Sequence, residues 1–143
     1  FQTYIKNVLA NAKMLAETLK NNGFKIYSGG TDTHLMLVDL RPFGVKGNIA
    51  SESLCRANIT CNKNGIPFDT EKPMITSGIR LGSQAATTRG FGLKEFEKVG
   101  ELITKVIKGL SKNPEDNSQI EEEVRKEVID LCSSFPIYKN LNR

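Results

Sequence analysis

Hydrophobic residues recur three and four positions apart near both ends of the chain, with polar residues between them. This spacing is typical of amphipathic helices. In the first such segment the apolar positions stop before Gly23, a residue suited to a left-handed helix C-cap. The pattern therefore predicts a helix over residues 1–22. Its apolar face consists of Phe1, Ile5, Val8, Leu9, Ala12, Leu15, Ala16 and Leu19.

Two more helices are predicted in the C-terminal third of the sequence. Apolar positions continue at helical spacing from Leu93 to Leu110, and Asn113 with the following proline is expected to end that helix. Ser118 and Glu121 have the spacing of a capping box, which predicts the start of a last helix that ends before Pro136.

The middle of the sequence contains short apolar runs separated by turn residues. Residues 24–28 and 35–40 predict strands, and the second run is apolar enough for burial on both faces. A helix is expected over 46–58, a short strand over 59–61, an irregular surface loop over 62–73 and a helical turn over 83–88. Helices on either side of a few short strands predict a two-layer α+β (α/β) domain, with helices packed on one face of a small sheet.

Bulk properties narrow the possible functions. The 143 residues have the length of a single domain. The net charge of +4 comes from cations interleaved with glutamates, which indicates a solvated surface and makes nucleic-acid binding an unfavoured explanation. No apolar run is long enough to span a membrane. Three cysteines without a C-x-x-C pair and a single histidine predict no disulfide framework, no metal site and a cytoplasmic location.

The stretch from Thr76 to Gly82 contains a lone arginine, Arg80, in an apolar run flanked by glycines. A guanidinium group can hold a planar carboxylate or phosphate through two parallel hydrogen bonds. An arginine paired with a structural carboxylate gives the same sequence pattern, so the residue chemistry leaves both roles open.

Three further residues are candidates for a site. Asp32 and His34 lie in the turn before the second predicted strand, and we expect both to be structural because a histidine needs a partner to act. Arg89 is a possible second cation near the site, although a role in supporting the adjacent turn or a domain contact is favoured.

Several segments taken together, in their order and spacing, resemble a known family. The segments are Ser28–Leu35, Arg56–Thr60, Asn62–Asp69, Thr76–Gly82 and Thr87–Gly92. They are similar to the C-terminal part of serine hydroxymethyltransferase, a fold-type I enzyme that depends on pyridoxal 5'-phosphate, and the likeness runs from Phe1 to about Tyr138. The resemblance implies that residues 1–143 form one C-terminal domain of a longer enzyme. In it, residues 1–22 would continue a helix from the missing region, 23–138 would form the body of the small domain, and 139–143 would be a frayed tail.

The resemblance also implies a reaction and roles for individual residues. The reaction is the reversible transfer of a one-carbon unit from serine to tetrahydrofolate, which gives glycine and methylenetetrahydrofolate. Arg80 would bind the substrate carboxylate, and Asn64 would approach the pteridine ring of the folate. The catalytic residues and the lysine that holds pyridoxal phosphate as a Schiff base would lie in the missing region, so the fragment alone would be inactive. A homodimer or higher oligomer is implied as well.

Alternatives to these roles follow from the residues themselves. Asn62 and Asn64 are also typical turn residues that tolerate a left-handed backbone. The basic charge is compatible with a module that binds RNA or another anion. A carboxylate-binding arginine would equally suit another fold-type I enzyme, such as an aminotransferase. However, the loop Asn62–Asn64 resembles a folate-binding loop, for which an aminotransferase has no use.

Overall fold

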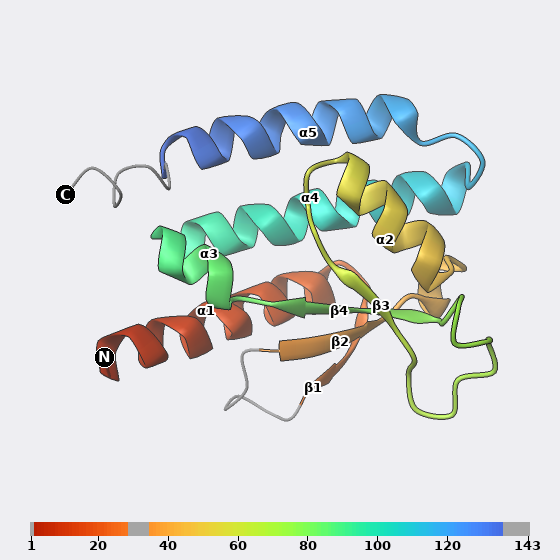
Figure 1. The fold of residues 1–143 in the computed structure, drawn as a ribbon, viewed down its shortest axis with the longest axis horizontal. Coiled ribbons are helices and arrows are strands. Elements are labelled where there is room, and N and C mark those ends of the chain that lie inside the picture. The colour runs from red at the N-terminus through yellow and green to blue at the C-terminus, as the bar shows by residue number, and fades with distance from the viewer. Residues whose placement is uncertain (1, 29–34, 136–143) are drawn as a thin grey trace.

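The computed structural model describes residues 2–28 and 35–135. Within them, five α-helices pack on a small four-stranded antiparallel sheet, which confirms the predicted two-layer α+β class (Figure 1). The elements are α1 Gln2–Asn21, β1 Lys25–Ser28, β2 Leu35–Asp39, a 3-10 turn η1 Arg41–Phe43, α2 Gly47–Arg56, β3 Asn62–Asn64, β4 Gly78–Gly82, α3 Gln84–Arg89, α4 Leu93–Lys112 and α5 Ser118–Ser133.

The strands lie in the order β1, β2, β4, β3, and every neighbouring pair is antiparallel. Val38 on β2 pairs with Ile79 on β4, and both side chains are fully buried in the core. Because side chains alternate along a strand, the neighbouring pair Leu37 and Arg80 lies on the opposite face. The sheet therefore has one face in the core and one open face.

The open face makes one detail of the sequence prediction wrong. Strand β2 is predicted to be buried on both faces, but Leu35 is 42% exposed and Leu37 is only half-buried. The described helices cover the core face alone, so Leu35 and Leu37, which point the other way, stay accessible.

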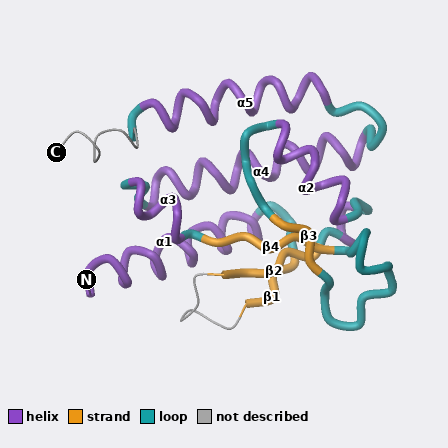
Figure 2. Tube along the Cα trace, viewed as in Figure 1, coloured by secondary structure: helices purple, strands orange, loops and turns teal. Residues whose placement is uncertain are grey.

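Three long helices, α1, α4 and α5, lie side by side in that order, and α1 and α4 complete the core with the sheet (Figure 2). Gly100 on α4 allows the close approach of α1, because a Cβ atom there would lie 2.7 Å from Cγ2 of Thr18. The predicted helix limits at Gly23, which has a φ of +98°, and at Asn113 are confirmed.

The third strand is not where the sequence predicts it. Residues 59–61 form no regular element, and the strand is β3, within the segment predicted to be an irregular loop. Asn58, at a φ of +72°, turns the chain after α2, and Ile59 donates its backbone N–H to the carbonyl of Leu54. Residues 59–61 therefore belong to the turn that follows α2, and the polar residues Asn62–Asn64 form the edge strand.

The predicted capping box of the last helix is also wrong. Asn117 is the N-cap residue of α5, and Ser118 donates its hydroxyl to Oδ1 of Asp116 at 2.6 Å. Glu121 points into the protein and binds residues of α2 instead.

Some predictions fall outside the described part of the chain. Asp32, His34 and the tail 139–143 lie there, so their predicted structural roles stay predictions. Within residues 2–28 and 35–135, no helix is both long enough and apolar enough to cross a membrane.

Candidate functional site

Arg80 lies in the middle of β4, between β2 and β3, with its side chain on the open face. It is exposed, and among the described residues its guanidinium group has no hydrogen-bond or ion-pair partner. A buried carboxylate on the same face, that of Asp39, is bound by Arg41, with Nη2 of Arg41 at 2.8 Å. The structural ion pair that the sequence leaves open for Arg80 therefore has no counterpart in the described chain.

Asp39 is held as a carboxylate by these contacts. Burial alone would raise its pKa, but the hydrogen bonds from the side chain and backbone of Arg41 outweigh burial and lower it. The pair joins the end of β2 to η1, so the carboxylate of Asp39 is already engaged by a cation other than Arg80.

Asn64 lies on the same face as Arg80. Asn62 pairs directly with Arg80, and Asn64 pairs with Gly78, so Asn64 and Arg80 are diagonal neighbours across β3 and β4. Diagonal neighbours in an antiparallel pair are about 7–8 Å apart, within reach of one ligand. The residues at positive φ in the described chain include Asn58 but neither Asn62 nor Asn64, which argues against the turn explanation for this pair.

Gly78 makes this arrangement possible. A Cβ atom at Gly78 would lie 2.7 Å from Cγ2 of Ile66 and 2.8 Å from the carbonyl oxygen of Val38. The absence of a side chain lets β3 and its following loop pack closely on β4. The side-chain amide of Asn64 donates to the carbonyl of Gly65 at 2.9 Å and borders a hollow of about 360 Å³.

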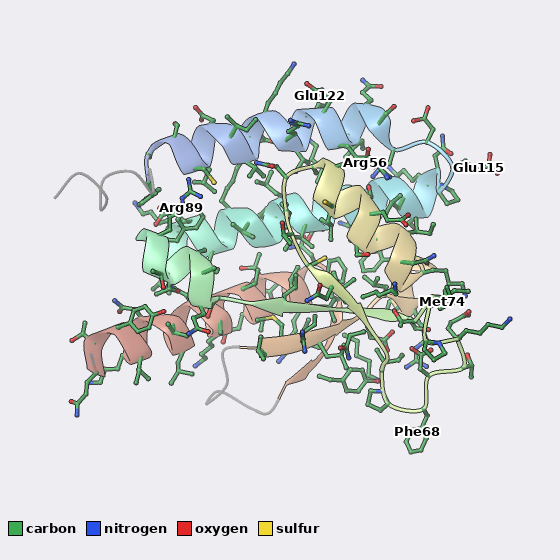
Figure 3. The ribbon with its side chains drawn as sticks, viewed as in Figure 1. Arg56, Phe68, Met74, Arg89, Glu115 and Glu122 are labelled. Carbon is green, nitrogen blue, oxygen red and sulfur yellow. The ribbon has the colours of Figure 1, made fainter. Side chains whose placement is uncertain are left out.

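The connection from β3 to β4, residues 65–77, is organised by Asp69. Its carboxylate accepts hydrogen bonds from the backbone N–H groups of Ile66, Glu71 and Ser77 and from the hydroxyl of Ser77. Burial raises the pKa of Asp69, but these donors more than compensate and lower it to about 2. Phe68, beside it, is 96% exposed and projects from the loop away from the domain (Figure 3).

Arg89 has a structural contact. It ends α3, and its Nε donates to the backbone carbonyl of Phe135 at 2.7 Å, which ties α3 to the end of α5 (Figure 3). The same side chain borders a mainly apolar hollow of about 470 Å³ between α3, α4 and α5. This contact supports the role favoured from the sequence, a support for the turn, over that of a second cation at the site.

A buried polar cluster joins α2 to α5, and the sequence reasoning did not find it. Glu121 accepts hydrogen bonds from Nε and Nη2 of Arg56, each at 2.9 Å, and from the hydroxyl of Ser53 at 2.5 Å. Hydrogen bonds from Arg56 lower the pKa of Glu121, against the opposing effect of burial. A signal was present: Glu121 has the helical spacing of the buried residues Val124 and Val128, so a carboxylate lies on the apolar face.

Residues 2–28 and 35–135 contain neither a cluster of metal ligands nor a disulfide. No group of three or more His, Cys, Asp or Glu side chains lies close enough there to hold a metal ion. The three cysteines are free, and burial raises the pKa of Cys61 to about 12, which keeps that thiol protonated.

These observations define a class: a small α+β domain whose open sheet face presents an exposed arginine and an adjacent amide side chain. Comparison with known proteins gives the family. The family model for serine hydroxymethyltransferase matches residues 1–103, so the chain belongs to the serine hydroxymethyltransferase family. The match favours this family over that of a different fold-type I enzyme, such as an aminotransferase.

Individual relatives agree over almost the whole chain. The chain is 86% identical over 141 residues to a serine hydroxymethyltransferase of Pelagibacter ubique. The aligned region covers 99% of this chain and 32% of the relative. It is 63% identical over 139 residues to a serine hydroxymethyltransferase of Marinomonas, covering 97% of this chain and 33% of the relative. The chain thus spans about a third of the length of the curated relatives it matches.

Proposed function

We propose that this chain is the C-terminal third of a serine hydroxymethyltransferase, which transfers the hydroxymethyl carbon of serine to tetrahydrofolate and releases glycine. Membership of the family supports the activity, since the relatives described above carry that name. The observation that carries the role of this domain is the exposed guanidinium group of Arg80 on the open face of the sheet, which has no partner among residues 2–28 and 35–135.

In this proposal Arg80 binds the α-carboxylate of serine and glycine. Its strand is hydrogen-bonded on both sides, to β2 and to β3, so the guanidinium group projects from a rigid base. Two coplanar carboxylate oxygens match two parallel N–H donors, which sets both the position and the rotation of the amino acid.

Asn64 is the proposed folate contact. An amide side chain both donates and accepts hydrogen bonds, which suits the edge of a pteridine ring. Its diagonal position next to Arg80 would place the folate and the amino acid over one sheet face. Carbon transfer between two substrates requires such proximity, and a fixed arrangement of reactants lowers the barrier considerably.

Pyridoxal phosphate is the cofactor that the family implies, and when bound it supplies an electron sink for bond cleavage at the amino acid. The donors of the open face, a guanidinium group and amides, suit a substrate carboxylate and folate more than a covalent attachment of the cofactor. Several described lysines are engaged elsewhere: Lys46 with Glu71, and Lys98 and Lys105 with Glu127. As the family resemblance implies, we place the cofactor lysine outside this chain.

The proposal includes an assembly and a location. A homodimer or higher oligomer would bring the other parts of the enzyme over the open face, and the three free cysteines fit a cytoplasmic protein. The test is to assay the full-length protein for formation of glycine from serine that depends on tetrahydrofolate. Glycine formation at the same rate without folate, or transamination of serine instead, would contradict the proposal.

A further inference from the structure

Asp69 lies in the connection between the two strands that carry the proposed site residues. Strand β3 ends at Asn64 and β4 begins at Gly78, and residues 65–77 between them contain turns but no helix or strand. Without regular structure, such a connection needs other hydrogen bonds if β3 is to keep a constant position relative to β4. In this structure one side chain, that of Asp69, accepts several of them.

All four hydrogen bonds of the Asp69 carboxylate go to this connection. Oδ2 accepts from the backbone N–H groups of Ile66 at 3.2 Å and Ser77 at 2.8 Å. Oδ1 accepts from the backbone N–H of Glu71 at 2.9 Å and from the hydroxyl of Ser77 at 2.8 Å. Ile66 closely follows Asn64, and Ser77 immediately precedes β4, so one carboxylate joins the end of one site strand to the start of the other.

The backbone beside Asp69 is strained. Phe68 has a φ of +57° and Thr76 a φ of +61°, a region that bulky and β-branched residues rarely adopt. Such conformations persist only where the surroundings hold them. Here Asp69 anchors the residue after Thr76, and the buried hydroxyl of Thr76 donates to the carbonyl of Gly78 at 3.0 Å.

The two site strands depend on this connection to different degrees. Strand β4 is held by β2 through five residue pairs in addition to its contact with β3. Strand β3 is an edge strand that pairs with β4 alone, over Asn62, Lys63 and Asn64. Loss of the anchor should therefore move Asn64 and leave Arg80 largely in place.

We propose that Asp69 is a positioning residue that holds Asn64 at a fixed distance and orientation from Arg80. This inference rests on the proposed function, in which those two residues bind folate and the amino acid. In this proposal Asp69 acts through the backbone of β3 and not through a contact of its own with either ligand.

The test uses the full-length enzyme and measures the affinity for tetrahydrofolate in the presence of glycine, and the affinity for glycine separately. Asp69→Asn keeps the shape of the side chain but replaces one of the two acceptor oxygens with an NH2 group, which can only donate. It should weaken folate binding about tenfold, on the scale of one lost hydrogen bond to a ligand, with glycine affinity within about twofold. A loss of glycine affinity as large as that of folate would overturn the proposal.

Asp116→Asn is the matched control. Asp116 also accepts hydrogen bonds from the N–H and the hydroxyl of a serine two residues away, Ser118, but it lies in the connection before α5. Its replacement should leave both affinities unchanged. Equal losses of folate affinity in the two variants would show a general effect on the fold and contradict a positioning role.

A double-variant cycle separates positioning from general destabilisation. If Asp69 acts through Asn64, adding Asp69→Asn to Asn64→Ala causes little further loss of folate affinity, whereas independent effects multiply. If Asn64→Ala weakens folate binding and Asp69→Asn does not, the positioning role is wrong and the folate role stands. If Asn64→Ala has no effect, the folate role itself is wrong and the inference falls with it. If Asp69→Asn does not fold, Ser77→Ala is the substitute, because it removes one of the donors to Asp69. It should weaken folate binding by less than Asp69→Asn would. Unchanged folate affinity in Ser77→Ala would count against the proposal.

Discussion

Replacement of Arg80 by lysine tests the carboxylate clamp most directly. Lysine keeps the positive charge but has no planar fork, so it can donate to one carboxylate oxygen at a time and no longer fixes the rotation of the amino acid. Rotation matters because the bond to be cleaved must have a defined orientation relative to the cofactor. The variant therefore removes the two parallel hydrogen bonds and keeps the positive charge.

The expected size of the effect follows from the hydrogen bonds to the substrate that the substitution removes. A hydrogen bond to a charged group contributes about 1.5–3 kcal/mol, so losing one of two, together with the orientation, costs about 3 kcal/mol of transition-state stabilisation, or roughly 100-fold in kcat/KM. Arg80→Ala should cost no less. Since Arg80 has no partner among the described residues, the free energy of unfolding should change by less than about 0.5 kcal/mol.

The assay is the rate of glycine formation from serine in the full-length enzyme, with thermal unfolding measured in parallel. Arg56→Lys is a suitable control, because Arg56 uses the same fork within the protein, on Glu121. Its side chain is partly exposed, so we expect a loss of about 1 kcal/mol of stability with kcat/KM for serine near the parental value. The two arginines should thus show opposite patterns.

A substrate analogue that lacks the carboxylate gives a second check, since its cleavage should be insensitive to the residue at position 80. Near-parental activity of Arg80→Lys with serine would refute the clamp. So would a fall in stability as large as that of Arg56→Lys, because it would reveal a structural ion pair.

Three other predictions can be tested. Asn64→Ala in the full-length enzyme should weaken folate binding by on the order of 1 kcal/mol, a few-fold to tenfold, while glycine binding stays nearly intact; equal folate affinity in variant and parent would contradict the folate contact. The isolated chain, mixed with pyridoxal phosphate and reduced with borohydride, should give only weak adducts spread over surface lysines, and a stoichiometric adduct at one lysine by mass spectrometry would overturn the placement of the cofactor lysine. Hydrogen bonds lower the pKa of Asp69 to about 2 despite the opposing effect of burial, below its ordinary 3.8, so its stabilisation is complete above about pH 4 and is lost as the pH falls toward 2. Urea unfolding at pH 6 and pH 3 should show a smaller acid-induced loss in Asp69→Asn than in the parent, and identical losses would refute this contribution.

The helices could be predicted from the sequence because their information is local. The apolar spacing of α1 and α4 and the residues at their ends, Gly23 and Asn113, determine where each helix lies without reference to the rest of the chain. The family could be predicted as well, since the segments that carry the resemblance are contiguous, and the family model confirms it.

The position of β3 could not be predicted in this way. Asn62, Lys63 and Asn64 are polar, and they form a strand only because β4 offers backbone partners at the edge of the sheet. The role of Glu121 likewise depended on packing: a capping box needs only local residues, whereas the buried contact with Arg56 exists because α2 crosses α5 at that point.

The sequence by itself determined the helices, the α+β class and the residue types available for a site, because each of these depends on neighbours along the chain. Only the tertiary structure decided that Arg80 has no carboxylate partner among the described residues, that Asn64 shares its sheet face, and that Asp69 links their strands. These relations depend on strand register and on contacts between distant segments, and a one-residue change of register would place Asn64 on the opposite face from Arg80.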